Sequence, residues 1–222
     1  MVKMIMAIVG VLVMLFLYYL ALNMLDKQLD IGFARKENRF YFRVSLIIGS
    51  IMVLTWIAFC LLYESMELQR LLLMLIMFWA LAVLTVTDLI KRKIPNSFLI
   101  VFFSIWMFVT GINMIFDIDS CIDLFVSSLI GGAIGGMIFF LCRLISGKRL
   151  GAGDVKLVFV LGLYLTEQKV LQMTLHSMVL CCIYILVQMA RKKMDRKDSL
   201  PLVPFIFMGT IVTFLLPLPF LG

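Results

Sequence analysis

Charged residues are scarce in this sequence of 222 residues, in which Asp, Glu, Lys and Arg make up 15% and apolar residues make up 64%. Soluble domains carry roughly 25% charged and about 45–50% apolar residues. One water-soluble core cannot hold this much apolar surface, so lipid must act as the solvent for much of the chain. The composition therefore excludes an ordinary soluble domain and predicts a polytopic, all-α bundle of membrane-spanning helices.

Histidine and paired cysteines are also nearly absent. His176 is the only histidine, and none of the five cysteines forms a C-x-x-C pair. Zinc sites and disulfide frameworks need closely spaced or evenly paired cysteines, and a Ser-His or Cys-His hydrolase needs a histidine base. We therefore expect no zinc site, no disulfide framework and no histidine-dependent hydrolase. His176 lies inside an apolar run, and we interpret it as a hydrogen-bonded packing residue.

The net charge of +7 does not indicate a nucleic-acid partner. The basic residues stand in short clusters between apolar runs, a pattern that orients membrane helices. Nucleic-acid binding would need a basic face on a folded soluble domain, and the sequence contains no such domain. We expect lipid, and not nucleic acid, to surround this chain.

Apolar runs long enough to cross the hydrocarbon, which takes about 20 residues, recur along the whole chain. We predict eight spans: Met4–Leu25, Val44–Tyr63, Leu71–Thr87, Phe98–Phe116, Leu124–Ile145, Val155–Thr166, Val170–Ala190 and Leu200–Leu221. The sixth is short, and the first is interpreted as a retained anchor because no small-residue cleavage site follows it.

Every second loop between these spans is rich in Lys and Arg, whereas the alternate loops are not. Basic loops face the cytoplasm in multi-pass membrane proteins. The alternation therefore predicts that the basic loops face the cytoplasm and that both termini lie outside. It also supports the short sixth span, because removing that span would break the pattern.

Two acidic residues, Asp88 and Asp154, stand at the ends of predicted spans instead of in loops. An acidic group near the hydrocarbon is expensive, on the order of 2.5–3.5 kcal/mol at a helix centre. Span three runs inward and span six runs outward, so both carboxylates are expected at the same depth on the cytoplasmic side. Each residue taken singly also has a purely structural explanation. Asp88 could form a surface salt bridge with the basic run after it, and Asp154 could be a helix N-cap.

The two glycines around Ala152, Gly151 and Gly153, have no Cβ and allow close approach to Asp154. A second carboxylate, or an extended peptide, can then come near it. Two neighbouring carboxylates cannot both ionise readily, so they share one proton. Such a pair supplies one acid and one base, which can activate water and protonate a leaving amine.

Three segments carry a resemblance to a known family. Asp88–Asn96 reads DLIKRKIPN, Gly151–Leu157 reads GAGDVKL, and Pro201–Phe205 reads PLVPF with Gly209 four residues later. The first two resemble the aspartate motifs of the type IV prepilin peptidases, which are intramembrane aspartyl proteases. The third is similar to the proline-rich start of that family's last span. The resemblance runs from about Leu71 to the C-terminus.

The resemblance implies catalytic aspartates at Asp88 and Asp154, and neither metal nor organic cofactor. It also implies an active site on the cytoplasmic face of the cytoplasmic (inner) membrane, where the basic leader of a prepilin or pseudopilin is removed ahead of an apolar helix. The residues expected to shape this site or bind substrate are Gly151, Gly153, Lys156, Pro95 and Asn96. The partner of Lys156 is left open between Asp154 and a lipid phosphate.

The resemblance divides the chain at about residue 70. Residues 71–222 are expected to form a six-span catalytic core, and residues 1–70 contribute two further spans joined by a short basic cytoplasmic loop. Many members of the family also methylate the new N-terminus, with a cytoplasmic domain that carries C-x-x-C pairs. The corresponding loop, Asp26–Arg43, contains no cysteine. We therefore predict a peptidase without N-methylation.

Three alternatives remain beside this interpretation. A proton-coupled transporter would place its carboxylates near mid-membrane and show a repeat between its halves, and the sequence has neither feature. A presenilin-type protease would resemble the second motif only, and its first aspartate usually follows a tyrosine, whereas Thr87 precedes Asp88. A non-catalytic scaffold would have no need of both aspartates. The sequence indicates no oligomeric state.

Overall fold

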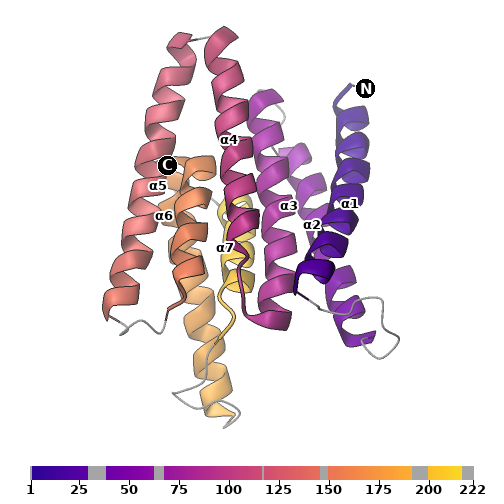
Figure 1. Ribbon diagram of the computed structural model, residues 1–222, viewed down its shortest axis with the longest axis vertical. Helices are drawn as coiled ribbons and strands as arrows, with labels where there is room; N and C mark the ends of the chain where they lie inside the picture. Colours follow the sequence, from indigo (N-terminus) through magenta and orange to yellow (C-terminus); the bar gives the residue numbers. More distant parts are fainter. Residues whose placement is uncertain are drawn as a thin grey trace. The chain divides into compact units, whose positions relative to one another are not determined.

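The computed structural model describes residues 2–29, 39–62, 68–116, 118–145, 150–191 and 200–216. These residues form seven helices and no strand, which confirms the predicted all-α class. Six of the described helices are long and apolar enough to cross a membrane, and α7 is shorter. The chain divides into two compact units, unit 1 (Met1–Lys93) and unit 2 (Ile94–Gly222) (Figure 1).

Unit 1 contains α1 (Val2–Leu29), α2 (Arg39–Leu62) and α3 (Leu68–Lys91). Each of the three helices packs against the other two. The Tyr18 hydroxyl of α1 donates a hydrogen bond of 2.9 Å to the Ser45 carbonyl of α2. Gly10 admits the Trp56 ring, since a Cβ at this glycine would lie 2.7 Å from Trp56 Nε1. A missing side chain thus lets α1 and α2 approach closely.

Unit 2 contains α4 (Asn96–Phe116), α5 (Ile118–Ile145), α6 (Ala152–Ala190) and α7 (Val203–Leu215). Helix α6 is central, because it packs against each of the other three. It is joined to α4 by Tyr164, whose hydroxyl donates a bond of 2.8 Å to the Phe102 carbonyl and whose ring stacks on Phe102. On α7, Thr213 Oγ1 lies 3.0 Å from His176 Nδ1, so the predicted hydrogen-bonded role of His176 is confirmed.

Helix α6 reverses its direction at Thr166, the one residue inside it with non-helical backbone angles (φ 68°, ψ 175°). A Cβ built on Gly135 of α5 would lie 3.1 Å from Val158 Cγ1 and 2.9 Å from Val170 Cγ2. In a straight helix, twelve residues span about 18 Å, so Val158 and Val170 could not both reach one point. The two segments, 152–165 and 167–190, are therefore antiparallel and correspond to the sixth and seventh predicted spans.

A stripe of glycines on α5 holds this reversed helix. A Cβ at Gly132 would lie 2.8 Å from Leu163 Cδ2, and one at Gly136 would lie 3.2 Å from Phe159 Cβ. Gly162 of α6 in turn faces the α5 backbone, because its Cβ would lie 2.7 Å from Gly132 Cα. The small residues let two helix backbones approach closely in lipid, and α5 and α6 run side by side in Figure 1.

With α6 counted as two segments, the described helices correspond to about eight spans. Helix α3 continues to Lys91, four residues beyond the predicted end of span three at Thr87. The boundary between the two compact units follows Lys93, whereas the predicted catalytic core begins at residue 71, inside α3. The boundary at Lys93 is defined by packing, and the boundary at residue 71 is defined by sequence resemblance. The two do not test each other, so the predicted catalytic core stays a prediction. The predicted sidedness of the loops and termini also stays a prediction.

Candidate functional site

Asp88 lies in the last turn of α3 and is only 6% exposed. Helix C-termini favour cations, and a carboxylate there opposes the helix dipole, so helix stability does not account for an aspartate at this position. The two threonines before it do not point their hydroxyls at solvent: Thr85 donates to the Leu81 carbonyl at 2.7 Å and Thr87 to the Leu84 carbonyl at 2.9 Å. Asp88 is thus a buried acid on a well-formed helix.

Helix α3 ends at Lys91, three residues after Asp88. The Arg92 N–H donates the last helical bond, of 2.9 Å, to the Asp88 carbonyl, and Arg92 itself has a left-handed φ of 51°. A left-handed residue at this point is a common way to end a helix. Its backbone cannot continue the helix, so Asp88 is held in the last complete turn. The basic residues that follow, Lys91, Arg92 and Lys93, are exposed.

The next helix begins at Pro95 and Asn96. Pro95 has no N–H to donate, but its carbonyl accepts a bond of 3.3 Å from the Leu99 N–H, which starts α4. The side chain of Asn96 accepts a hydrogen bond of 3.1 Å at Oδ1 from Lys156 Nζ. The sequence left the partner of Lys156 open between Asp154 and a lipid phosphate. In the structure Lys156 instead donates a hydrogen bond to Asn96. Both side chains are exposed, so the bond positions the two helix ends weakly.

Asp154 occupies the first turn of α6, three residues after the N-cap Gly151. This position favours a carboxylate, because the positive end of the helix dipole lies there. A Cβ on Gly151 would lie 2.8 Å from Asp154 Oδ2, closer than unbonded carbon and oxygen atoms normally come. The glycine therefore makes room for the carboxylate, which folds back toward the N-terminus of its own helix.

Gly153 brings α6 against the chain segment that starts α4. A Cβ on Gly153 would lie 3.1 Å from Ile94 Cβ, tighter than ordinary carbon contact. Ile94 directly precedes Pro95 and Asn96, so the end of the first motif and the second motif lie side by side within unit 2. Sequence reasoning assigned glycine here to close approach of a peptide or a carboxylate, and the structure adds Ile94 as the neighbour.

Six of the seven predicted site residues thus gather at one end of unit 2. They are Pro95, Asn96, Gly151, Gly153, Asp154 and Lys156. The seventh, Asp88, belongs to unit 1. Each acid is described within its own unit, and their approach to each other stays a prediction. Between Asp88 and Ile94 lie only five residues, Leu89 to Lys93.

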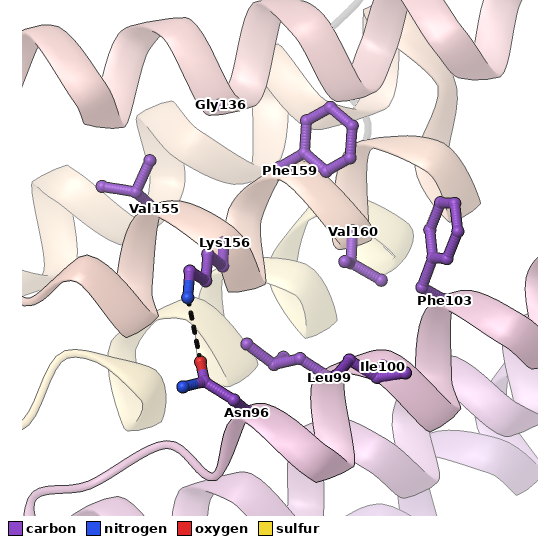
Figure 2. Close-up of a pocket in the computed structure, with 9 residues that line it drawn as sticks. All are labelled: Asn96, Leu99, Ile100, Phe103, Gly136, Val155, Lys156, Phe159 and Val160. Atoms are coloured by element: carbon purple, nitrogen blue, oxygen red, sulfur yellow. Dashed lines mark hydrogen bonds between the residues drawn. The ribbon is translucent and has the colours of Figure 1, made fainter.

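A groove in unit 2 was not predicted. It has a volume of about 590 Å³ and runs between α4 and α6 (Figure 2). We call it the α4–α6 groove; its lining residues are Asn96, Leu99, Ile100, Phe103, Gly136, Val155, Lys156, Phe159 and Val160. No sequence signal marks it, because its apolar residues resemble those of every other span. Asn96 and Lys156 belong to the two predicted motifs, but the motifs give no indication of a groove.

The part of the chain that the structure describes has no group of three or more His, Cys, Asp or Glu side chains placed to hold a metal ion. The candidate site itself offers carboxylates, an amide and an ammonium group. Carboxylates are the groups in this set that can exchange protons with water and with an amine near neutral pH.

Comparison with known proteins agrees with these motifs. A model of the type IV leader peptidase family matches residues 75–186, a range that includes all seven predicted site residues. The chain is also similar to the prepilin leader peptidase/N-methyltransferase of Bacillus subtilis (strain 168), with 27% identity over 135 residues. That match covers 61% of this chain and 52% of the relative, so the chain spans about half of the relative's length. No solved structure matches the chain.

Proposed function

Because the chain belongs to the type IV leader peptidase family, we propose that it is a membrane-embedded aspartic endopeptidase with Asp88 and Asp154 as its catalytic pair. Its substrates are prepilins or pseudopilins, whose basic leader it removes at the cytoplasmic face of the membrane. The observation that carries the proposal is the placement of the two acids at helix ends, one buried at the C-terminus of α3 and one in the first turn of α6. Neither a metal nor an organic cofactor takes part.

In this mechanism the two carboxylates share one proton. The ionised carboxylate takes a proton from a water molecule as the water oxygen bonds to the carbonyl carbon of the scissile peptide. The protonated partner then gives its proton to the peptide nitrogen as the C–N bond breaks. The products are a leader that ends in a carboxylate and a mature chain with a free amine. Each turnover consumes one water and returns the pair to its single shared proton.

Several contacts support this use of the two helix ends. Gly151 leaves room for the Asp154 carboxylate, and Gly153 lets the start of α6 approach Ile94 closely. The short connection from Asp88 to Ile94 leaves no space for an intervening domain. We propose that the two acids act on one peptide bond.

The proposed activity stops at cleavage. The related Bacillus protein is named as both a peptidase and an N-methyltransferase, but the match covers about half of it. The 26–43 segment of this chain lacks the cysteine pairs that the methylating members carry. Incubating the purified chain with prepilin and labelled S-adenosylmethionine tests this point. Label on the mature N-terminus would show that the chain methylates its product.

Cleavage of a co-reconstituted prepilin tests the peptidase itself. Asp88→Asn and Asp154→Asn each remove an acid while keeping its size, and each should lower the cleavage rate by about 100-fold or more, the usual range for a general acid or base. Asp123→Asn is the matched control, because Asp123 is an exposed acid of α5 outside both motifs. A normal rate in either of the first two variants would rule out the pair and favour a scaffold or transporter.

A further inference from the structure

The α4–α6 groove is amphiphilic in a particular way: its two polar side chains stand together at one end. Asn96 is the first residue of α4 and Lys156 lies in the second turn of α6. The remaining lining residues are aliphatic or aromatic, apart from Gly136. In Figure 2, the Lys156 nitrogen points to the Asn96 oxygen, and the rings of Phe103 and Phe159 lie farther along the groove. The groove therefore suits a ligand with one charged end and an apolar tail.

The charge at the polar end is positive and is not balanced within the groove. Lys156 donates one hydrogen bond, to the neutral amide oxygen of Asn96. An ammonium group has three N–H donors, so two remain for a ligand. No carboxylate lines the groove. The complementary ligand is an anion, and the positive charge disfavours the basic leader of a substrate at this point.

The apolar wall opens outward from unit 2. Ile100 is 64% exposed and Phe159 is 40% exposed, although both lie in membrane-spanning helices. The solvent for such side chains is lipid, so a lipid tail can enter the groove sideways without opening the helices. Because lipid tails are as apolar as these side chains, the wall adds packing and shape, and the charged head group supplies the selectivity.

We propose that the α4–α6 groove is a binding site for one anionic phospholipid. Its phosphate is held by Lys156 beside Asn96, and one acyl chain lies along Leu99, Ile100 and Phe159. The site is next to Asp154 on α6 but independent of its chemistry, so the proposal does not rest on the peptidase activity. The lipid would join the ends of α4 and α6 that the Lys156–Asn96 bond already connects.

Native mass spectrometry of the full chain tests this site. The protein, purified in a neutral detergent, is offered equal amounts of phosphatidylglycerol and phosphatidylcholine, and the retained lipid is counted. We expect one phosphatidylglycerol per chain on the wild type. Lys156→Gln, which removes the charge, should lower this retention about fivefold, the factor that corresponds to the roughly 1 kcal/mol carried by one lysine near an anionic lipid. Ile100→Trp, which fills the groove, should lower it at least as much, because the ring takes the space of the acyl chain.

Ile115→Trp is the matched control, because Ile115 is a 78% exposed isoleucine on α4 outside the groove. It should retain phosphatidylglycerol like the wild type. Equal retention by Ile100→Trp, or equal retention of the two lipids by the wild type, would overturn the proposal. Displacement of the lipid by added prepilin would assign the groove to the substrate helix and would overturn it as well. Retention is measured without cleavage, so a chain that holds lipid but cleaves nothing would contradict the proposed peptidase alone.

Discussion

Substituting Gly153 by alanine tests how the start of α6 positions its aspartate. The added Cβ would stand 3.1 Å from Ile94 Cβ, with Ile94 Cδ1 and Cγ1 at 3.5 and 3.6 Å. Carbon atoms pack best at about 3.5–4.0 Å, so the helix start and Ile94 must separate by roughly 0.4–0.9 Å. Asp154 is the next residue and must move with the helix start.

A shift of this size affects catalysis more than stability. A misplacement of about 1 Å can cost on the order of 100-fold in rate, so we expect Gly153→Ala to lower the rate constant for cleavage about ten- to hundredfold. Alanine also favours a helix over glycine by about 0.5–1 kcal/mol, which offsets part of the steric cost. The thermal unfolding midpoint should therefore change little while activity falls.

The assay compares turnover of saturating prepilin by purified, lipid-reconstituted variants, with unfolding followed by circular dichroism on the same samples. Gly111→Ala is the matched control, because a Cβ at Gly111 of α4 meets no atom within 4 Å. It should cleave like the wild type. If Gly153→Ala cleaves within about twofold of Gly111→Ala, contact with Ile94 does not position the catalytic aspartate, and that part of the reasoning is wrong.

Two further substitutions test neighbouring claims. Gly151→Ala would place a Cβ 2.8 Å from Asp154 Oδ2, so cleavage should fall at least about tenfold; activity equal to that of Gly111→Ala would show that the carboxylate does not need this space. Thr166→Gly should stabilise the protein by about 0.5–2 kcal/mol, because φ 68° with ψ 175° suits glycine alone, and thermal unfolding measures the gain. Thr166→Ala keeps the backbone strain and should give no such gain in stability. An equal gain from both substitutions would contradict the claim that the strain is relieved by glycine alone.

The helices could be predicted from the sequence because hydrophobic length is a local property. The reversal inside α6 was predicted as two spans separated near Glu167, but its tightness was not. One residue, Thr166, makes the turn, and neither glycine nor proline marks it. What holds the turn is contact between Gly162 and the glycine stripe of α5, and such contact depends on residues far apart in the sequence.

The two motifs predicted which residues belong to the candidate site, but not which atoms those residues contact. The glycines beside Asp154 were predicted to let a second carboxylate or a peptide come near. The structure places Ile94 against Gly153 and the Asp154 carboxylate itself against Gly151, so the approach of a second carboxylate stays a prediction. The partner of Lys156 was not predictable, because an ammonium group on a flexible side chain can reach several acceptors and only the packing of α4 beside α6 selects Asn96. The α4–α6 groove was missed for the same reason, since it arises from how two apolar helices meet.

The central claim is that Asp88 and Asp154 act as one catalytic unit, and a double-mutant comparison of cleavage rates tests it most directly. If the two acids share a proton and act on one bond, Asp88→Asn combined with Asp154→Asn should be no slower than the slower single variant, because either change already disables the pair. Rates that fall by the product of the two single effects would show that the acids act independently. That result would contradict the account.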